Sequence, residues 1–284
     1  MVCDVCFRHC NIPEGGRGFC GVRTCKGGRI VSVNYGKVTS LALDPVEKKP
    51  LARFHPGKNV LSVGSFGCTL RCPFCHNHSI SWDDEARLYE YTADVYTPEE
   101  LADIAEDCKD RGNIGIAFTY NEPLAGYEFV RDTAREVKKR GMLCVLVTSG
   151  NAQLDILEET APYIDAMNID LKGFTDSFYK KIGGDLGTVT RFIERAVQLC
   201  HVEITTLVIP GENDSEGEIR EISRFIAGLK DSRGNTIGKD VAYHISRFFP
   251  RFHMQDRAAT DVRLIYRLAD IAREELRYVY TGNC

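Results

Sequence analysis

The chain has 284 residues and a formal net charge of −4, which is long enough to bury one sizeable core. No apolar run reaches about 18 residues, and the N-terminus MVCDVCFRHC lacks the apolar core of a signal peptide, so we expect a cytosolic protein without membrane spans. The charge gives no global electrostatic reason to expect nucleic acid or an anionic membrane as a partner. In a reducing compartment, twelve cysteines indicate metal binding or redox chemistry rather than disulfides.

The first segment, residues 1–29, is rich in cysteine and glycine and has almost no apolar periodicity. A segment so short and polar buries too little surface to fold without a cross-link such as a metal site. Four thiolates complete a closed metal site, and the best quartet is Cys3, Cys6, Cys10 and Cys20. The number of ligands allows either zinc or a second [4Fe–4S] cluster; His9 is a further zinc-compatible ligand, and Cys25 is a spare or a substitute. The alternative is a disordered tail with unliganded thiols.

Residues 30–56 are expected to form a β-hairpin and a connection. The pattern IVSVNYGKVTSLAL alternates over residues 30–43 around a turn near Tyr35–Lys37, which is typical of a hairpin. The prolines and charges of DPVEKKPLARFHPGK then mark a surface connection that leads into the next strand.

Three cysteines follow that strand directly. Apolar residues at 60–63 predict a buried strand, and the loop GSFGCTLRCPFCHNH after it contains Cys68, Cys72 and Cys75. A [4Fe–4S] cluster and a structural zinc each take four ligands, so three thiolates leave one position open, which indicates chemistry rather than scaffolding. One alternative is a zinc site completed by His76 or His78, although zinc ligands are normally divided between two separated turns. The other alternative is a set of incidental cytosolic thiols.

Strand and helix patterns alternate through the remainder, residues 57–284. We expect six strands, at residues 60–63, 114–120, 143–148, 165–171, 203–209 and 241–246. Helical patterns separate them, including one that begins with the capping box Thr97–Glu100. This alternation predicts an α/β fold with a parallel sheet, a partial (β/α)6 TIM-like barrel. A terminal helix at 262–276 and a strand-like segment, Tyr278–Tyr280, are expected to cover its open side.

The loop motif CxxxCxFC, ending in CPFCHN, resembles the radical S-adenosylmethionine (SAM) superfamily and, within it, the glycyl-radical activating enzymes. The resemblance implies a [4Fe–4S] cluster on the three loop cysteines, with the amino and carboxylate groups of SAM on the fourth iron. It also implies that an electron from the reduced cluster, supplied by a reductant such as ferredoxin or flavodoxin, cleaves SAM to methionine and a 5′-deoxyadenosyl radical that abstracts hydrogen. Phe74 and His76, which flank Cys75, are the implied SAM contacts on this loop.

Polar motifs follow the later strands, at the ends where such barrels gather their active groups. Tyr120-Asn121-Glu122-Pro123 resembles the Gly-Gly-Glu-Pro loop of the family, with Tyr-Asn in place of Gly-Gly. The resemblance assigns Asn121 and Glu122 to the methionine amino group, and an ammonium does require an anionic acceptor. The alternative for Glu122 is an ordinary carboxylate at the N-terminus of the next helix.

The next two strands end in further polar residues. Ser149 and Asn151 suit the ribose or the methionine carboxylate of SAM, and the same stretch is also a good turn and N-cap. Asp170 and Lys172 share one face of their strand and resemble the segment with which glycyl-radical activases contact SAM. The alternative for this second pair is an internal ion pair.

The last two strands supply one candidate each. Ile209, before a Pro-Gly turn, suits packing against adenine. His244 matches a SAM-contacting histidine of the activases by position, and the alternative is a satisfied core histidine.

Over nearly its full length, the chain resembles the radical SAM member of the AmmeMemoRadiSam group, which is related to pyruvate formate-lyase activating enzyme. The segments that carry the resemblance are CDVCFRHCNIPEGGRGFCGVR, DPVEKKPL, the cysteine loop, FTYNEP, NIDLKGF and HISRFFP. Members of that group often continue past Gly-Asn with a further cysteine pair. Here the sequence stops at Cys284, so we expect a C-terminal metal site to be either absent or cut away.

The resulting hypothesis is a radical SAM enzyme that abstracts hydrogen from a substrate, which is a small molecule or a partner protein. A narrower version installs a glycyl radical on a partner protein. The alternative from another class is an iron–sulfur electron-transfer or metal-binding protein whose clusters are all closed. Beyond the SAM-like motifs, no stretch specifies the substrate, and the basic run Lys138–Arg140 is interpreted as a solvated helix end.

Overall fold

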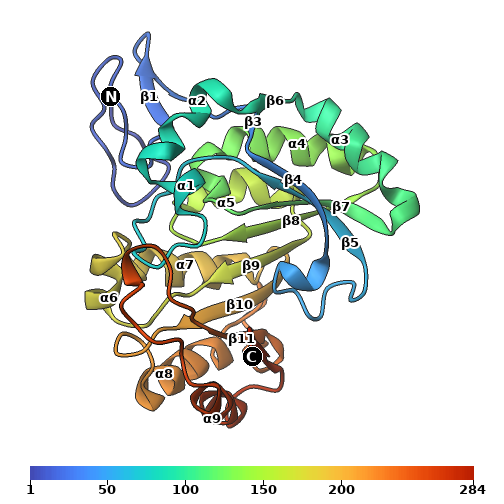
Figure 1. Cartoon of the computed structure of the whole chain (residues 1–284). Helices are drawn as coiled ribbons and strands as arrows, with labels where there is room; N and C mark the ends of the chain where they lie inside the picture. The colour runs from blue at the N-terminus through green and yellow to red at the C-terminus, as the bar shows by residue number, and fades with distance from the viewer.

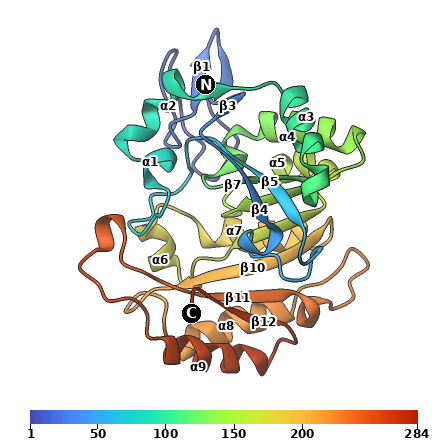
Figure 2. The same cartoon turned by 45° about the vertical axis from the view of Figure 1, so that its right-hand side comes forward.

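The computed structural model describes residues 1–284, and its main unit is an open sheet of eight strands (Figures 1 and 2). The order is β12-β11-β10-β9-β8-β7-β5-β4. Seven strands are parallel, and β4 runs antiparallel to β5 at one edge. The strands are β4 (Ser40–Pro45), β5 (Asn59–Gly64), β7 (Asn113–Thr119), β8 (Leu143–Thr148), β9 (Ala166–Asp170), β10 (His201–Val208), β11 (Ala242–Arg247) and β12 (Val279–Gly282).

Nine helices connect these strands, and the longer of them pack against one face of the sheet. They are α1 (His78–Ser81), α2 (Tyr89–Thr92), α3 (Pro98–Asp107), α4 (Tyr127–Lys139), α5 (Leu154–Thr160), α6 (Asp176–Lys181), α7 (Leu186–Ala196), α8 (Glu216–Ala227) and α9 (Val262–Arg273). Short 3₁₀ turns are η1 (Val46–Lys48), η2 (Asp84–Arg87), η3 (Lys109–Arg111), η4 (Pro123–Gly126), η5 (Ala161–Tyr163), η6 (Gly238–Asp240) and η7 (Phe252–Met254). The capping box predicted at α3 is present, because Thr97 accepts from Glu100 N and the Glu100 carboxylate accepts from Thr97 N.

The predicted fold class, a partial (β/α)6 TIM-like barrel, is confirmed. All six expected strands are present, each joined to the next by helical structure. The strand-like C-terminal segment forms β12, which extends the sheet as a parallel neighbour of β11. Strands β4 and β12 are the two edges and do not pair, so the barrel stays open between them.

The hairpin predicted at residues 30–43 is wrong in position. The hairpin of this region is formed by β1 (Arg23–Lys26) and β2 (Arg29–Ser32). Its two-residue turn is Gly27-Gly28, and both glycines have φ near +60° to +70°, as a tight hairpin turn requires. The alternating residues after it are divided between β3 (Lys37–Val38), which pairs with β6 (Asp94–Val95), and β4, which pairs with β5.

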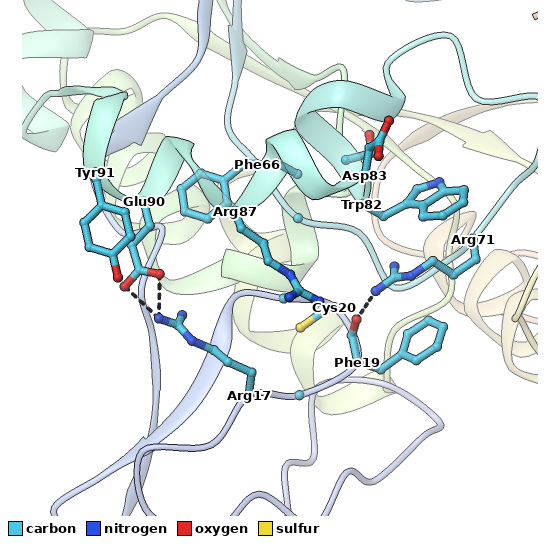
Figure 3. Close-up of a pocket in the computed structure, with 15 residues that line it drawn as sticks. Arg17, Phe19, Cys20, Phe66, Arg71, Trp82, Asp83, Arg87, Glu90 and Tyr91 are labelled. Atoms are coloured by element: carbon cyan, nitrogen blue, oxygen red, sulfur yellow. Dashed lines mark hydrogen bonds and ion pairs between the residues drawn. The ribbon is translucent and has the colours of Figure 1, made fainter. Parts of the chain in front are cut away.

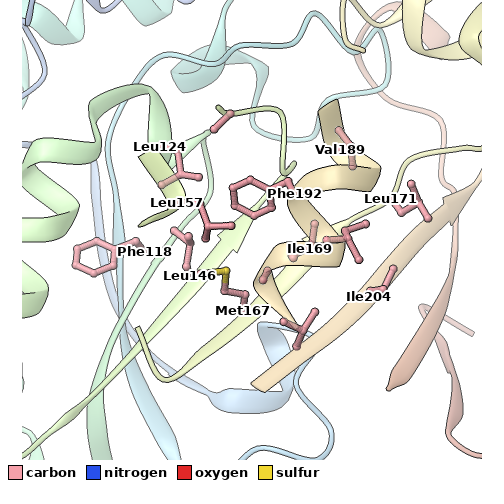
Figure 4. Close-up of a cluster of buried hydrophobic side chains, with 14 of the residues drawn as sticks. Phe118, Leu124, Leu146, Leu157, Met167, Ile169, Leu171, Val189, Phe192 and Ile204 are labelled. Carbon is pink, nitrogen blue, oxygen red and sulfur yellow. The ribbon is translucent and has the colours of Figure 1, made fainter. Parts of the chain in front are cut away.

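The main hydrophobic core lies between the sheet and the helices that cover it. Figure 4 shows part of it, where Phe192 of α7 lies beside Ile169 of β9 and Leu146 of β8. These three side chains are fully buried, and the alternate residues of each strand face the other side of the sheet. No helix is long and apolar enough to cross a membrane.

The connection after β4 closes one end of the barrel, and we call residues 46–55 the floor segment (Figure 2). Its Val46 and Leu51 are fully buried against small and branched residues of the inner face of the sheet: Val60, Ala117, Val145 and Ala166. Polar contacts fix it further, since Asn168 Nδ2 donates to the Pro50 carbonyl at 2.8 Å. The backbone N–H groups of Ala52 and Arg53 donate to the buried carboxylate of Glu203 at 2.9 and 2.8 Å.

The cysteine-rich segment packs against the opposite end of the barrel. Its Val5 and Ile12 belong to the main core, and the Val5 carbonyl accepts a hydrogen bond from Gln153 N at 3.0 Å. Arg23, which is 2% exposed, forms a two-point ion pair with Glu128 of α4. The segment therefore obtains much of its burial from the barrel.

Candidate active site

The loop after β5 brings its three cysteines to one cavity of about 380 Å³, which we call the main cavity. Cys68, Cys72 and Cys75 all contribute to its lining. Burial raises the pKa of each thiol, that of Cys72 to about 12, so a metal that binds thiolates must displace these protons. The loop packs tightly at Gly67, where φ is +91° and a Cβ atom would lie 2.3 Å from Val22 Cγ1.

Predicted site residues from the ends of four neighbouring strands, β5, β7, β8 and β9, meet at this same cavity. Parallel strands place their carboxyl ends at one edge of the sheet, so loops distant in sequence converge there. The predicted site residues that line the main cavity, besides the three cysteines, are Phe74, His76, Asn121, Glu122, Ser149, Asp170 and Lys172. The structure thus brings ten predicted residues together.

Glu122 is 3% exposed, and its carboxylate joins the ends of β7 and β8. Oε1 accepts from Thr148 Oγ1 at 2.7 Å and from Leu124 N at 3.1 Å. Oε2 accepts from the backbone N and the Oγ of Ser149 at 2.8 and 2.6 Å. A carboxylate has about four acceptor positions, so in this conformation Glu122 holds the two loops in place.

Asp170 and Lys172 form the internal ion pair considered above, with 2.9 Å between Oδ2 and Nζ. Both also line the main cavity, so the pair faces the ligand space. Although burial opposes it, the neighbouring Asp170 carboxylate raises the pKa of Lys172. A positive charge is therefore held beside the cysteine loop.

Three predicted residues lie outside the lining of the main cavity. Asn151 is buried, and its Oδ1 accepts from Asp185 N at 3.3 Å. Ile209 is fully buried in the core. His244 donates from Nε2 to Glu203 at 2.6 Å and stacks on Tyr280, whereas Ser246, two residues further along the strand, lines the main cavity.

Sequence reasoning missed several residues that line the main cavity, above all Lys48 and Lys49 of the floor segment. The motif DPVEKKPL is part of the family resemblance, but its prolines and charges predict a surface connection, whereas Lys49 is buried. In the sequence, Tyr120 stands out only as a departure from Gly-Gly. Its φ is +75°, and its ring lies against Gly64, where a Cβ atom would come within 2.7 Å of it.

The predicted N-terminal quartet also gathers in space. Burial raises the pKa of Cys6 to about 12, and the nearby thiols of Cys20, Cys10 and Cys3 contribute to the shift. Cys25 stands apart and donates from Sγ to Glu14 at 3.4 Å. The structure contains no group of three or more His, Cys, Asp or Glu side chains arranged around a single metal ion. A cubane cluster, by contrast, is bound through separate iron atoms.

A second cavity, of about 340 Å³, lies between this segment and residues 81–91 (Figure 3). Arg17 pairs there with Glu90 at 2.5 Å, and Arg71 donates to the Phe19 carbonyl. Cys20 lines this cavity too, so the second cavity borders the N-terminal thiols. Arg71 therefore lies between the two cysteine sets, because it also donates to the Cys68 carbonyl at 3.0 Å.

A family model described as Radical SAM superfamily matches residues 62–223, which is more than half of the sequence. The chain belongs to the radical SAM superfamily. It is a radical SAM enzyme, and enzymes of this superfamily use a [4Fe–4S] cluster and SAM. The resemblance to pyruvate formate-lyase activating enzymes that the sequence carries is likewise confirmed.

Two curated relatives illustrate the range of similarity. An uncharacterized protein of Methanocaldococcus jannaschii is 38% identical over 288 residues, which covers 99% of this chain and 80% of that protein. Pyruvate formate-lyase-activating enzyme of Clostridium pasteurianum is 28% identical over 178 residues, covering 62% of this chain and 73% of that enzyme.

Solved structures share the fold. SuiB of Streptococcus suis bound to S-adenosylmethionine has a TM-score of 0.59 at 13% identity, covering 79% of this chain and 52% of that one. QueE from Escherichia coli has a TM-score of 0.52 at 14% identity, covering 86% and 92%. These similarities support the partial barrel.

Proposed function

We propose that this enzyme binds a [4Fe–4S] cluster through Cys68, Cys72 and Cys75 and reductively cleaves SAM beside it for hydrogen abstraction from a substrate. The observation that carries the proposal is the meeting of three thiols and a ring of polar strand-end residues at one cavity. The donor set fits the cluster, because three thiolates bind three irons and leave the fourth open. When bound, the cluster supplies the electron that converts SAM to methionine and a 5′-deoxyadenosyl radical.

Several side chains around the main cavity have different roles in positioning SAM. Asn121 holds the start of the cysteine loop, because its side-chain amide accepts from Ser65 N and donates to the Gly67 carbonyl. Ser149 offers a hydroxyl oxygen beside that loop, and Lys172 offers a cation that complements the carboxylate of methionine. Glu122 fixes the loops that present these groups. Phe74 packs in the core beside the cysteines and stacks on Phe178 with ring centroids 6.4 Å apart, so it excludes water from this edge.

We infer that the N-terminal quartet holds a metal centre of its own, either zinc or a second iron–sulfur cluster. The support is the gathering of four thiols, three of them buried, without disulfide bonds. The ligands would be Cys3, Cys6, Cys10 and Cys20.

Reconstitution under anaerobic conditions tests the radical SAM proposal. The enzyme reduced with dithionite in the presence of SAM should release 5′-deoxyadenosine, measured by liquid chromatography. The Cys72→Ala variant should release none, whereas Cys108→Ala, a buried core cysteine outside the main cavity, should retain the activity. A fully loaded cluster that yields no 5′-deoxyadenosine and whose paramagnetic spectrum is unchanged by SAM would contradict the proposal.

The second candidate function is a narrower one, the installation of a glycyl radical on a partner protein. Several relatives are named pyruvate formate-lyase activating enzymes, which favours a protein as substrate and a reductant such as ferredoxin or flavodoxin as electron donor. Mixing the reduced enzyme and SAM with candidate glycyl-radical proteins should then give an organic radical in the paramagnetic spectrum. If no candidate gives an organic radical, the glycyl-radical function is excluded, but the broader radical SAM function is not.

A further inference from the structure

The floor segment carries a lysine into the interior of the barrel. The Lys49 side chain is 3% exposed and lines the main cavity. Its Nζ donates to Asp44 Oδ2 at 3.0 Å and lies 4.8 Å from the centroid of the Tyr120 ring. An ammonium has three N–H donors, and the Asp44 contact is its only hydrogen bond, so two donors remain for a ligand. A buried cation with unused donors is costly unless a ligand satisfies them.

This end of the main cavity carries surplus positive charge. The Asp44 carboxylate accepts from Lys49 on one oxygen and from Lys48 on the other, at 3.2 Å. Tyr120 Oη and Ser62 Oγ also donate to Asp44, at 3.0 and 2.9 Å, and add no charge. Two ammonium groups therefore face one carboxylate, and an anion entering the cavity meets a net attraction.

The Lys49 ammonium is separated from the start of the cysteine loop by the Tyr120 ring. Its partner Asp44 is opposite Val60 in the β4–β5 ladder, four residues before Gly64, where the cysteine loop begins. At about 3.3 Å per residue, the Asp44 backbone is about 13 Å from Gly64 along the strand, and its carboxylate extends toward the loop as far as Ser62 Oγ. The groups assigned to SAM surround the cysteine end, so the lysine end of the main cavity is available to a second molecule.

We propose that Lys49 and Lys48 bind an anionic group, a carboxylate or a phosphate, of the substrate. The inference rests on the proposed function, which makes the main cavity the reaction chamber, and adds the chemical class of the substrate. Lys49 donates two hydrogen bonds to the oxygens of the anion inside the barrel. Lys48, whose side chain is 66% exposed, attracts the anion at the opening.

Anion binding to the reconstituted holoenzyme with SAM, without a reductant, tests the proposal. Isothermal titration with inorganic phosphate and, separately, with succinate should show binding of at least one of them to the wild type. Lys49→Gln should weaken that binding at least tenfold, as expected for the loss of charge-assisted hydrogen bonds. Lys58→Gln is the matched control, because Lys58 is exposed in the connection that follows and lies outside the main cavity. The anion that binds more tightly identifies the group as phosphate or carboxylate.

A double variant distinguishes the loss of the anion site from misfolding of the protein. Asp44→Asn/Lys49→Gln removes both members of the buried pair, so no buried charge is left unpaired and only the exposed Lys48 loses its partner. It should show the same loss of anion binding with SAM affinity retained. Three results would overturn the inference: unchanged anion affinity in both variants, no binding of either anion to the wild type, or an equal loss of SAM affinity. No radical chemistry is used, so a failure to form 5′-deoxyadenosine remains a separate result.

Discussion

The backbone N–H of Cys68 donates a hydrogen bond to the carbonyl oxygen of Cys20, with 3.2 Å between the two atoms. Arg71 reinforces this contact, because its guanidinium donates to the Cys68 carbonyl at 3.0 Å and also to the Phe19 carbonyl. The N-terminal cysteines and the loop cysteines are therefore parts of one connected structure.

Metal analysis of variants should distinguish the metal bound by the loop cysteines from the metal bound by the N-terminal quartet. Anaerobically purified Cys68→Ala/Cys72→Ala/Cys75→Ala is expected to lose about four iron atoms per chain relative to the wild type, since one cluster is removed. It should retain the metal of the N-terminal quartet, which Cys3→Ala/Cys6→Ala should lose instead. Elemental mass spectrometry measures both. An iron content in the triple variant equal to that of the wild type would exclude the loop cysteines as cluster ligands.

Replacing Glu122 by glutamine should weaken SAM binding about tenfold. A neutral amide cannot accept all four hydrogen bonds, and its NH₂ group opposes the Ser149 N–H, so the ends of β7 and β8 lose their fixed geometry. Calorimetric titration of the reconstituted enzyme with SAM measures the change. Glu99→Gln, an exposed glutamate of α3, serves as the control. Equal SAM affinities in the two variants would show that Glu122 does not position the site.

Lys172→Met should make the reduction potential of the loop cluster more negative, by an amount on the order of tens of millivolts. The reduced cluster carries one more negative charge, and the variant removes a cation that acts on Cys72. A redox titration followed by paramagnetic resonance measures the potential. Lys181→Met, whose lysine is 63% exposed, should leave the potential unchanged. A potential in Lys172→Met that matches the wild type would place this charge outside the influence of the cluster.

Glu203→Gln should destabilise the protein in a pH-dependent way. Burial alone would raise the pKa of Glu203, but hydrogen bonds from His201, His244 and two backbone N–H groups lower it to about 2. A lowered pKa stabilises the folded state above the unfolded value of 4.5, by about 3 kcal/mol, and this contribution is lost as the pH falls toward 2.

Urea unfolding at two pH values checks this expectation. The free energy of unfolding of Glu203→Gln should be lower than that of the wild type, and this difference should be smaller at pH 4 than at pH 7 by about 1 kcal/mol. Asp270→Asn, which affects a 74% exposed carboxylate, should show a change of less than about 0.5 kcal/mol at either pH. A deficit that grows on acidification would contradict the assignment.

The fold was largely predictable from the sequence because the patterns that indicate its strands and helices depend on residues close together in the chain. The apolar strands and the capping box before α3 depend on neighbouring residues, and so does the spacing of the loop cysteines. The hairpin was misplaced because an alternating stretch does not reveal its partners, and β4 found its partner in β5.

The site was predictable only where a motif marked it. His244 has a family position, but sequence does not show that Glu203 satisfies it from the neighbouring strand. Lys49 has no local signal at all, because its burial depends on the floor segment folding back under the sheet. Residues brought in by long-range packing therefore need the structure.

The floor segment also has a kinetic consequence. Since it seals one end of the barrel with Val46 and Leu51, the main cavity is closed at that end, and the exposed residues of its lining are Lys48, Asn283 and His76 of the cysteine loop. Molecules that use the chamber together must therefore enter and leave through the gap on its open side. The one that binds deeper has to arrive first and depart last, so we expect a compulsory order of addition and product inhibition by the molecule nearest the gap.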